Sequence, residues 1–144
     1  ILIRGKILTL NKCYNKLFKK KPKIVVLGLN PHNSENRLDS IENKIITPTI
    51  KKLRKIGLDI KGPFPADTIF NNQKKIDYNV IVGMYHDQVL APFKALYGYD
   101  AINITLGLKY LRISPDHGIA SDLIGRNKAN PESLIAAINF LKKN

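Results

Sequence analysis

The 144-residue sequence lacks several features that define whole classes of protein. It has one cysteine, Cys13, so it can form neither an internal disulfide nor a cysteine-based zinc site. No apolar run approaches the roughly 20 residues that cross a bilayer, and no stretch has the order of a signal peptide. A composition of 44% hydrophobic and 24% charged residues excludes disorder, collagen and coiled coil. We therefore expect a soluble globular domain with no membrane partner, cytoplasmic by default.

Acidic residues are also scarce. The chain has 24 Lys and Arg against 11 Asp and Glu, a formal charge of +13, and its first 23 residues hold eight of the basic side chains and no acid. Such a balance raises the hypothesis of nucleic-acid binding. However, only five of the basic residues are Arg and aromatic residues make up 8%, whereas groove reading favours Arg and single-strand binding favours stacked aromatics. The pattern argues against a nucleic-acid partner.

Helical periodicity indicates two amphipathic helices in the first half of the chain. Apolar residues recur at helical spacing over residues 3–17, which predicts the first helix. Asp39 followed by Glu42 resembles a capping box and predicts the start of the second helix, which Gly57 closes. Pro48 predicts a kink or a restart within that second helix.

Short β-branched runs alternate with these helices. Residues 23–29 and 78–85 have the composition of buried strands, and each passes directly into a polar loop. The further predicted elements are strands at 58–61, 101–106 and 110–114, helices at 66–68 and 89–96, and a terminal helix capped by Asn130. Alternation of this kind predicts a layered α/β/α domain with a largely parallel sheet, a mixed sheet being the alternative.

All three histidines of the chain, His32, His86 and His117, stand in short polar loops that follow predicted strands. Ligands of layered α/β folds bind at the carboxyl ends of strands, and a neutral imidazole is a common metal ligand. Asp87 and Glu35 are carboxylates suited to orient such ligands. The spacing matches no compact metal signature, and a single histidine of this kind is more often a surface residue. The pattern alone leaves both interpretations open.

Recognition of a phosphate or carboxylate needs a cation and fixed donors. Lys94, Asn103 and Arg112 are candidates because they lie near or within the elements that follow the His86 loop, although charged residues of this chain are mostly solvated. The sequence contains no GxGxxG, no GxxxxGK[ST] and no GxSxG, so it predicts neither a Rossmann fingerprint, a P-loop nor a serine elbow.

Five short segments taken together are more specific than any of these patterns. They are Gly28-Leu29-Asn30-Pro31-His32, Gly62-Pro63-Phe64-Pro65-Ala66-Asp67-Thr68, Met84-Tyr85-His86-Asp87-Gln88, Asn103-Ile104-Thr105-Leu106-Gly107-Leu108 and Asp116-His117-Gly118. In order and separation they resemble the motifs of the 4-hydroxythreonine-4-phosphate dehydrogenase family of vitamin B6 biosynthesis. The resemblance covers nearly all of this chain but only the C-terminal part, under half, of a typical member. Because the chain also opens at Ile1 without an initiator methionine, we expect residues 1–144 to be the C-terminal portion of a longer protein.

The resemblance implies an NAD-dependent and divalent-metal-dependent enzyme. Such an enzyme oxidises the 3-hydroxyl of 4-phosphooxy-L-threonine, a phosphorylated amino acid, to a β-keto acid that loses carbon dioxide and gives 3-amino-2-oxopropyl phosphate. It works as a homodimer with its metal, which we expect to be zinc, magnesium or cobalt, in a cleft. The family binds NAD without the Rossmann glycine fingerprint, so the cofactor residues of this chain stay unassigned.

The resemblance also implies roles for particular residues. It places metal ligands at His32 and His86, with a third histidine in a part of the family sequence absent here, and it does not make His117 a ligand. The family's loop after the first metal histidine is often glycine-rich, whereas residues 33–36 here are not. The other positions it carries over are Lys94, Asn103 and Arg112 for substrate binding, and Asp67 and Asp87 as catalytic candidates with an orienting role.

Two alternative functions accompany this interpretation. One is a related dehydrogenase acting on another phosphorylated hydroxy acid, and the other is a non-catalytic remnant or interaction domain that keeps the sheet. Because two histidines make a poor metal site, we expect residues 1–144 alone to bind metal weakly and to turn over little or no substrate.

Overall fold

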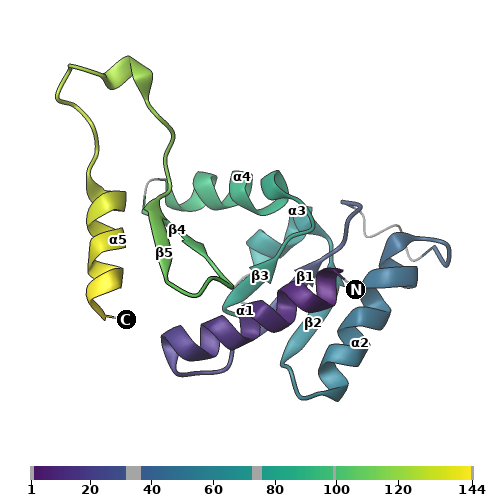
Figure 1. The fold of residues 1–144 in the computed structure, drawn as a ribbon. Coiled ribbons are helices and arrows are strands. Elements are labelled where there is room, and N and C mark those ends of the chain that lie inside the picture. The colour runs from purple at the N-terminus through teal and green to yellow at the C-terminus, as the bar shows by residue number, and fades with distance from the viewer. Residues whose placement is uncertain (1, 32–36, 73–75, 99, 144) are drawn as a thin grey trace. The chain divides into compact units, whose positions relative to one another are not determined.

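The computed structural model of the chain describes residues 2–31, 37–72, 76–98 and 100–143 (Figure 1). The chain divides into two compact units, Ile1–Pro92 and Phe93–Asn144, and the boundary between them falls within one helix, α4 (His86–Tyr97). Each unit is described here by itself. The predictions made for His32 and Glu35 lie outside the described residues.

A three-stranded parallel sheet forms the centre of the first unit. Its strands are β1 (Ile24–Leu27), β2 (Ile60–Phe64) and β3 (Val80–Val82), in the order β2-β1-β3. All four residues of β1 are buried, as expected for a β-branched run in the middle of a sheet that is covered on both faces. The three residues of β3 at the edge are only half-buried, so this strand is shorter and less buried than the sequence predicts.

Helices cover both faces of this sheet. Ile24 and Val26 of β1 pack with Ile7 of α1 (Leu2–Phe18) and Leu53 of α2 (Thr47–Lys55). The alternate residues of β1 face the other way and pack with α3 (Ala66–Ile69) and with the first turns of α4. Figure 1 shows α1 and α2 beside β1 and β2. This arrangement confirms the predicted α/β class, with two helical layers around a parallel sheet.

The helix that leads to α2 begins differently from its predicted capping box. Ser40, rather than Asp39, accepts a hydrogen bond from a backbone N–H three residues on, that of Asn43. The first turns are a π-helix, η2 (Glu42–Ile46), and α2 then restarts with Pro48 in its first turn. The restart predicted at Pro48 is therefore confirmed, because proline is accommodated where its missing N–H is not needed. The capping role predicted for Glu42 is wrong, since its carboxylate binds elsewhere.

The second unit contains an antiparallel pair of strands, β4 (Ile102–Thr105) and β5 (Arg112–Pro115). The helix α5 (Glu132–Lys143) packs on both strands, and Asn130 caps it by accepting a hydrogen bond from the N–H of Glu132 at 2.8 Å. The strands and the capped helix are confirmed. Parallel pairing does not extend to β4 and β5, because the short connection between them suits only an antiparallel pair.

The remaining elements are short 3-10 turns, η3 (Phe70–Asn72) and η4 (Ser121–Leu123). Among the described residues, every helix is too short or too polar to cross a bilayer. The segment His86-Asp87-Gln88, predicted to be a loop, is instead the first turn of α4. His86 and Asp87 therefore project from a helix and not from a loop.

Candidate functional site

The carboxyl ends of the three parallel strands lie at one edge of the first unit's sheet, because parallel strands all run in the same direction. Leu27 ends β1 and is followed by the segment 28–31, Phe64 ends β2 just before Asp67, and Val82 ends β3 shortly before His86. Ligands of open α/β sheets bind at this edge. Of the predicted metal and catalytic residues, Asp67, His86 and Asp87 therefore share the edge where such a site is expected.

A buried glutamine joins two of these strand ends. The Gln88 side chain, 6% exposed, donates a hydrogen bond from Nε2 to the backbone oxygen of Gly28 at 2.7 Å. Its Oε1 accepts a hydrogen bond from the N–H of Met84, also at 2.7 Å. Gly28 follows β1 and Met84 follows β3, so one amide satisfies a backbone group at each strand end.

A buried carboxylate binds the backbone of the second and third residues after β1. Oε1 of Glu42, a side chain only 2% exposed, accepts hydrogen bonds from the N–H groups of Leu29 and Asn30, both at 2.8 Å. Buried charge is costly unless it is hydrogen-bonded, and two backbone donors provide that compensation. Glu42 thus fixes the backbone that leads into the segment containing His32.

His86 lies in the first turn of α4 with its imidazole 78% exposed. Its Nδ1 is 2.6 Å from Oδ1 of Asp87. Because an ionised carboxylate only accepts hydrogen bonds, this contact makes Nδ1 the protonated nitrogen and leaves the lone pair on Nε2. A carboxylate behind an imidazole is the usual arrangement around a metal-binding histidine, so His86 and Asp87 fit the predicted metal in their donor chemistry.

The described residues supply only part of a metal site. Within the part of the chain that the structure describes, no three His, Cys, Asp or Glu side chains gather as a metal cluster. Asp67 lies exposed in the first turn of α3. Of the two predicted ligands, His86 lies within the described residues, and its fit to a metal rests on the Asp87 contact.

At the opposite edge of the sheet, an ion pair stabilises the amino ends of the strands. The Lys23 ammonium is hydrogen-bonded to the Asp77 carboxylate, and the Lys23 N–H donates to Oδ1 of Asn79 at 2.9 Å. The hydrogen bond and the charge of Asp77 raise the pKa of Lys23. This pair holds β1 beside β3 and lies at the edge away from the candidate site.

In the second unit, Lys94 belongs to a hydrogen-bonded network. Its ammonium donates to the backbone oxygen of Asp116 and pairs with Oδ2 of the same residue at 3.2 Å. The N–H of Asp116 donates to Oγ of Ser133 at 2.9 Å, and that hydroxyl, 1% exposed, donates to the backbone oxygen of Ala101. Lys94, predicted as a substrate contact, is thus held by Asp116.

Asn103 and Arg112 lie on the antiparallel pair. Thr105 stands opposite Arg112 in the register, and Asn103 is two residues before Thr105, so all three side chains share one face of the pair. Arg112 Nη1 donates a hydrogen bond to Oγ1 of Thr105 at 2.9 Å. Both predicted contact residues are exposed on this common face, where a carboxylate or phosphate could reach them.

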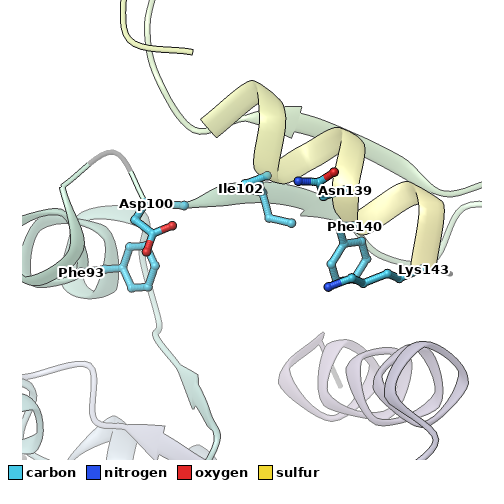
Figure 2. A pocket seen from close by; sticks show the side chains of 8 residues that line it. Phe93, Asp100, Ile102, Asn139, Phe140 and Lys143 are labelled. Carbon is cyan, nitrogen blue, oxygen red and sulfur yellow. The ribbon is translucent and has the colours of Figure 1, made fainter. Parts of the chain in front are cut away.

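A pocket of about 420 Å³ lies elsewhere in the second unit (Figure 2). Figure 2 shows Asp100 and Phe93 on one side and Phe140 and Lys143 of α5 on the other, with Ile102 of β4 between them. Since side chains alternate along a strand, this pocket lies on the face of β4 opposite to Asn103. None of the predicted site residues that the structure describes lines it.

His117, the third histidine, is exposed after β5, and its Nδ1 donates a hydrogen bond to the backbone oxygen of Gly118 at 3.0 Å. Among the residues that the structure describes, no carboxylate contacts this ring as Asp87 contacts that of His86. The described surroundings of the two histidines therefore differ.

The sequence did not identify the polar residues that hold these side chains and segments. Gln88, Glu42, Asp116 and Ser133 each bridge segments far apart in the chain, and no local pattern marks such a contact. Two features of the sequence pointed weakly to these residues. Gln88 belongs to the motif Met84-Tyr85-His86-Asp87-Gln88, and Glu42 is an acid among apolar helix positions.

The parallel sheet, the polar residues at its carboxyl edge and the histidine–aspartate pair are features of a layered α/β protein with a candidate ligand site at the sheet edge. Comparison with known proteins is more specific, because the model of the family described as "Pyridoxal phosphate biosynthetic protein PdxA" matches residues 2–141. The chain belongs to this family, as the resemblance of its motifs predicted.

Relatives of known sequence and structure agree with this assignment. A 4-hydroxythreonine-4-phosphate dehydrogenase of Xanthobacter autotrophicus is 47% identical over 123 residues, which are 85% of this chain and 35% of that protein. The crystal structure of the 4-hydroxythreonine-4-phosphate dehydrogenase from Klebsiella pneumoniae is 38% identical with a TM-score of 0.77, covering 95% of this chain and 42% of that one. The chain therefore spans well under half the length of these relatives.

A relative named for a different activity shares the fold. The terephthalate 1,2-cis-dihydrodiol dehydrogenase of Burkholderia xenovorans is 30% identical with a TM-score of 0.71, covering 98% of this chain and 45% of that one. All three of these relatives are named as dehydrogenases, which are oxidoreductases.

Proposed function

We propose that the protein containing this chain oxidises 4-phosphooxy-L-threonine with NAD. The 3-hydroxyl becomes a ketone as hydride passes to NAD and the hydroxyl proton is released. The resulting β-keto acid loses carbon dioxide and gives 3-amino-2-oxopropyl phosphate, a step towards pyridoxal 5'-phosphate. The observation that carries this proposal is the Asp87–His86 pair in the first turn of α4, in a chain whose relatives carry the name of this dehydrogenase.

In this function His86 offers Nε2 to a divalent cation, with His32 and a histidine from outside residues 1–144 as the other ligands. A cation held there would supply Lewis-acid chemistry, lowering the pKa of the substrate hydroxyl and polarising a carbonyl at the same carbon. Asp87 keeps the His86 proton on Nδ1 and fixes the ring orientation. We assign to Asp67, which is exposed after β2 at the same sheet edge, the role of orienting the polar groups of the substrate.

Lys94, Asn103 and Arg112 bind the anionic groups of the substrate. Arg112 can form paired hydrogen bonds with a phosphate or carboxylate, and Lys94 contributes a point charge. Asn103 supplies a neutral donor on the same face as Arg112. We further propose that the protein is a cytoplasmic homodimer that uses zinc, magnesium or cobalt.

The test uses the full-length native protein with NAD, each of the three cations and 4-phosphooxy-L-threonine. We expect metal-dependent formation of NADH together with release of carbon dioxide. Residues 1–144 alone should yield little or no NADH and bind metal weakly, because ligands are missing. Absence of NADH from the metal-loaded full-length protein would overturn the proposal.

The dihydrodiol dehydrogenase relative favours a second candidate, a dehydrogenase for another hydroxylated substrate. The same assay with other phosphorylated hydroxy acids and with an unphosphorylated cis-dihydrodiol separates the two. Turnover of one of those compounds, and not of 4-phosphooxy-L-threonine, would favour the second candidate. Failure of every substrate, with no metal bound, would favour a non-catalytic remnant.

A further inference from the structure

We propose that Gln88 is a positioning residue for the metal site: its buried amide locks the first turn of α4, which carries His86, to the carboxyl end of β1. The inference rests on the proposed metal-dependent function. It goes beyond that function because it assigns a role to a side chain that touches neither metal nor substrate.

The hydrogen-bond chemistry at Gln88 requires a primary amide. Gly28 offers a carbonyl oxygen, which needs a donor, and Met84 offers an N–H, which needs an acceptor. An amide supplies both from one side chain, whereas a carboxylate supplies only acceptors and a thioether supplies almost neither. Both contacts are 2.7 Å and the side chain is 6% exposed, so losing either one leaves a polar group buried without a partner.

The turn between β3 and α4 is packed tightly around this amide. A Cβ built on Gly83 would lie 2.7 Å from Cγ1 of Val89 and 3.4 Å from Oε1 of Gln88. The glycine therefore allows the strand end to approach the first turn of the helix. With Gln88 fixed on both sides and its neighbours in close contact, the first turn of α4 has little freedom to shift.

Gln88 influences the position of His86 through the backbone of the first turn of α4. His86 and Asp87 precede Gln88 directly in the same helical turn, so the backbone from which the imidazole projects is the backbone that Gln88 holds. The ring itself is 78% exposed and fixed by only the Asp87 contact, so its placement depends on that backbone. The first predicted ligand, His32, follows Gly28 by four residues in the sequence.

The experiment measures binding of Co²⁺ to the full-length native protein from its visible absorption spectrum. Gln88→Met removes the donor and the acceptor at similar volume, and Gln88→Glu keeps the acceptor for Met84 but sets an oxygen against the Gly28 carbonyl. Leu53→Ala, in the core formed by α2, is the control for general destabilisation. Thermal midpoints are measured for all four proteins.

We expect both Gln88 variants to bind Co²⁺ at least about tenfold more weakly than wild type, with an altered absorption band, as is usual when residues behind metal ligands are changed. Leu53→Ala should lower the thermal midpoint and leave Co²⁺ affinity and spectrum unchanged. Wild-type affinity and spectrum in a folded Gln88 variant would overturn the inference while leaving the proposed function intact.

Two further outcomes are also decisive. Failure of the wild-type protein to bind Co²⁺ would overturn the proposed function and the inference with it. Should neither Gln88 variant fold, exchange of the Gln88 side-chain amide hydrogens is measured by NMR in the wild-type protein before and after Co²⁺ is added. Slow exchange that slows further with Co²⁺ supports the inference, and exchange unaffected by Co²⁺ would overturn it.

Discussion

The ammonium group of Lys94 lies 3.2 Å from Oδ2 of Asp116 and also donates a hydrogen bond to the backbone oxygen of that aspartate. The Asp116 side chain is only 17% exposed, so this lysine is held in one place, unlike a freely solvated surface lysine. Because Ser133 anchors the backbone of Asp116 in turn, the position of the Lys94 charge is fixed by the packing of α5.

Replacing Lys94 with methionine should weaken substrate binding. A hydrogen bond to a charged group contributes about 1.5–3 kcal/mol, so we expect KM for the phosphorylated substrate to rise by a factor of about 10 to 100 with a smaller change in kcat. Steady-state kinetics of the full-length protein measure this. Lys128→Met, an exposed lysine of the same unit, is the control and should leave KM unchanged. An unaltered KM in Lys94→Met would remove Lys94 from the proposed substrate site.

Replacing His86 should separate a metal histidine from an ordinary surface histidine. We expect His86→Ala to abolish metal-dependent NADH formation in the full-length protein, because a ligand with its own carboxylate partner is lost. His117→Ala is the matched control, since His117 is exposed and, among the residues that the structure describes, its ring is hydrogen-bonded only to the backbone oxygen of Gly118. Equal activity in the two variants would contradict the assignment of His86.

Removing the Ser133 hydroxyl should destabilise the second unit. Oγ of Ser133 accepts from the N–H of Asp116 and donates to the oxygen of Ala101, so Ser133→Ala leaves two buried backbone groups without that partner. We expect the free energy of unfolding to fall by about 1–3 kcal/mol. Urea denaturation measures the change, and Ser121→Ala, at an exposed position, should shift it by less than about 0.5 kcal/mol. An equal loss of unfolding free energy in the two variants would show that the hydrogen bonds of Ser133 stabilise the unit no more than those of an exposed serine.

Two glycines should respond to alanine in opposite directions. Gly62 has φ +129, and a Cβ there would lie 2.4 Å from the backbone oxygen of Val26, so Gly62→Ala forces β1 and β2 apart. We expect a loss of more than about 2 kcal/mol in the free energy of unfolding. Gly5 lies within α1 with open space around it, and Gly5→Ala should stabilise the protein by about 0.5–1 kcal/mol. Urea denaturation of both variants checks the sign, and a stabilised Gly62→Ala would refute the close approach.

Local patterns predicted the elements that depend on neighbouring residues. The period of apolar residues identified α1, the β-branched run identified β1, and Asn130 with the acidic turn after it identified the start of α5. The restart at Pro48 followed from the chemistry of proline alone. The quoted motifs likewise indicated the family to which the chain belongs.

Predictions that depended on distant contacts were less successful. Glu42 matched a capping pattern, yet its carboxylate binds the N–H groups of Leu29 and Asn30, more than ten residues away. The alternation of strands and helices favoured a largely parallel sheet, with a mixed sheet as the alternative, and it did not indicate that β4 and β5 form a separate antiparallel pair. In each case a local rule was outweighed by a hydrogen-bond partner that the fold brings close.

The sequence by itself determined the class of fold, the family and the residues with the chemistry of a site, because these follow from residue type and spacing. Only the tertiary structure decided which side chains are held by distant parts of the chain: Lys94 by Asp116, and Gln88 by Gly28, with Met84 on its other side. The physical reason is that a buried polar group must be paired, and for Gln88 the partner at Gly28 lies 60 residues away in the chain.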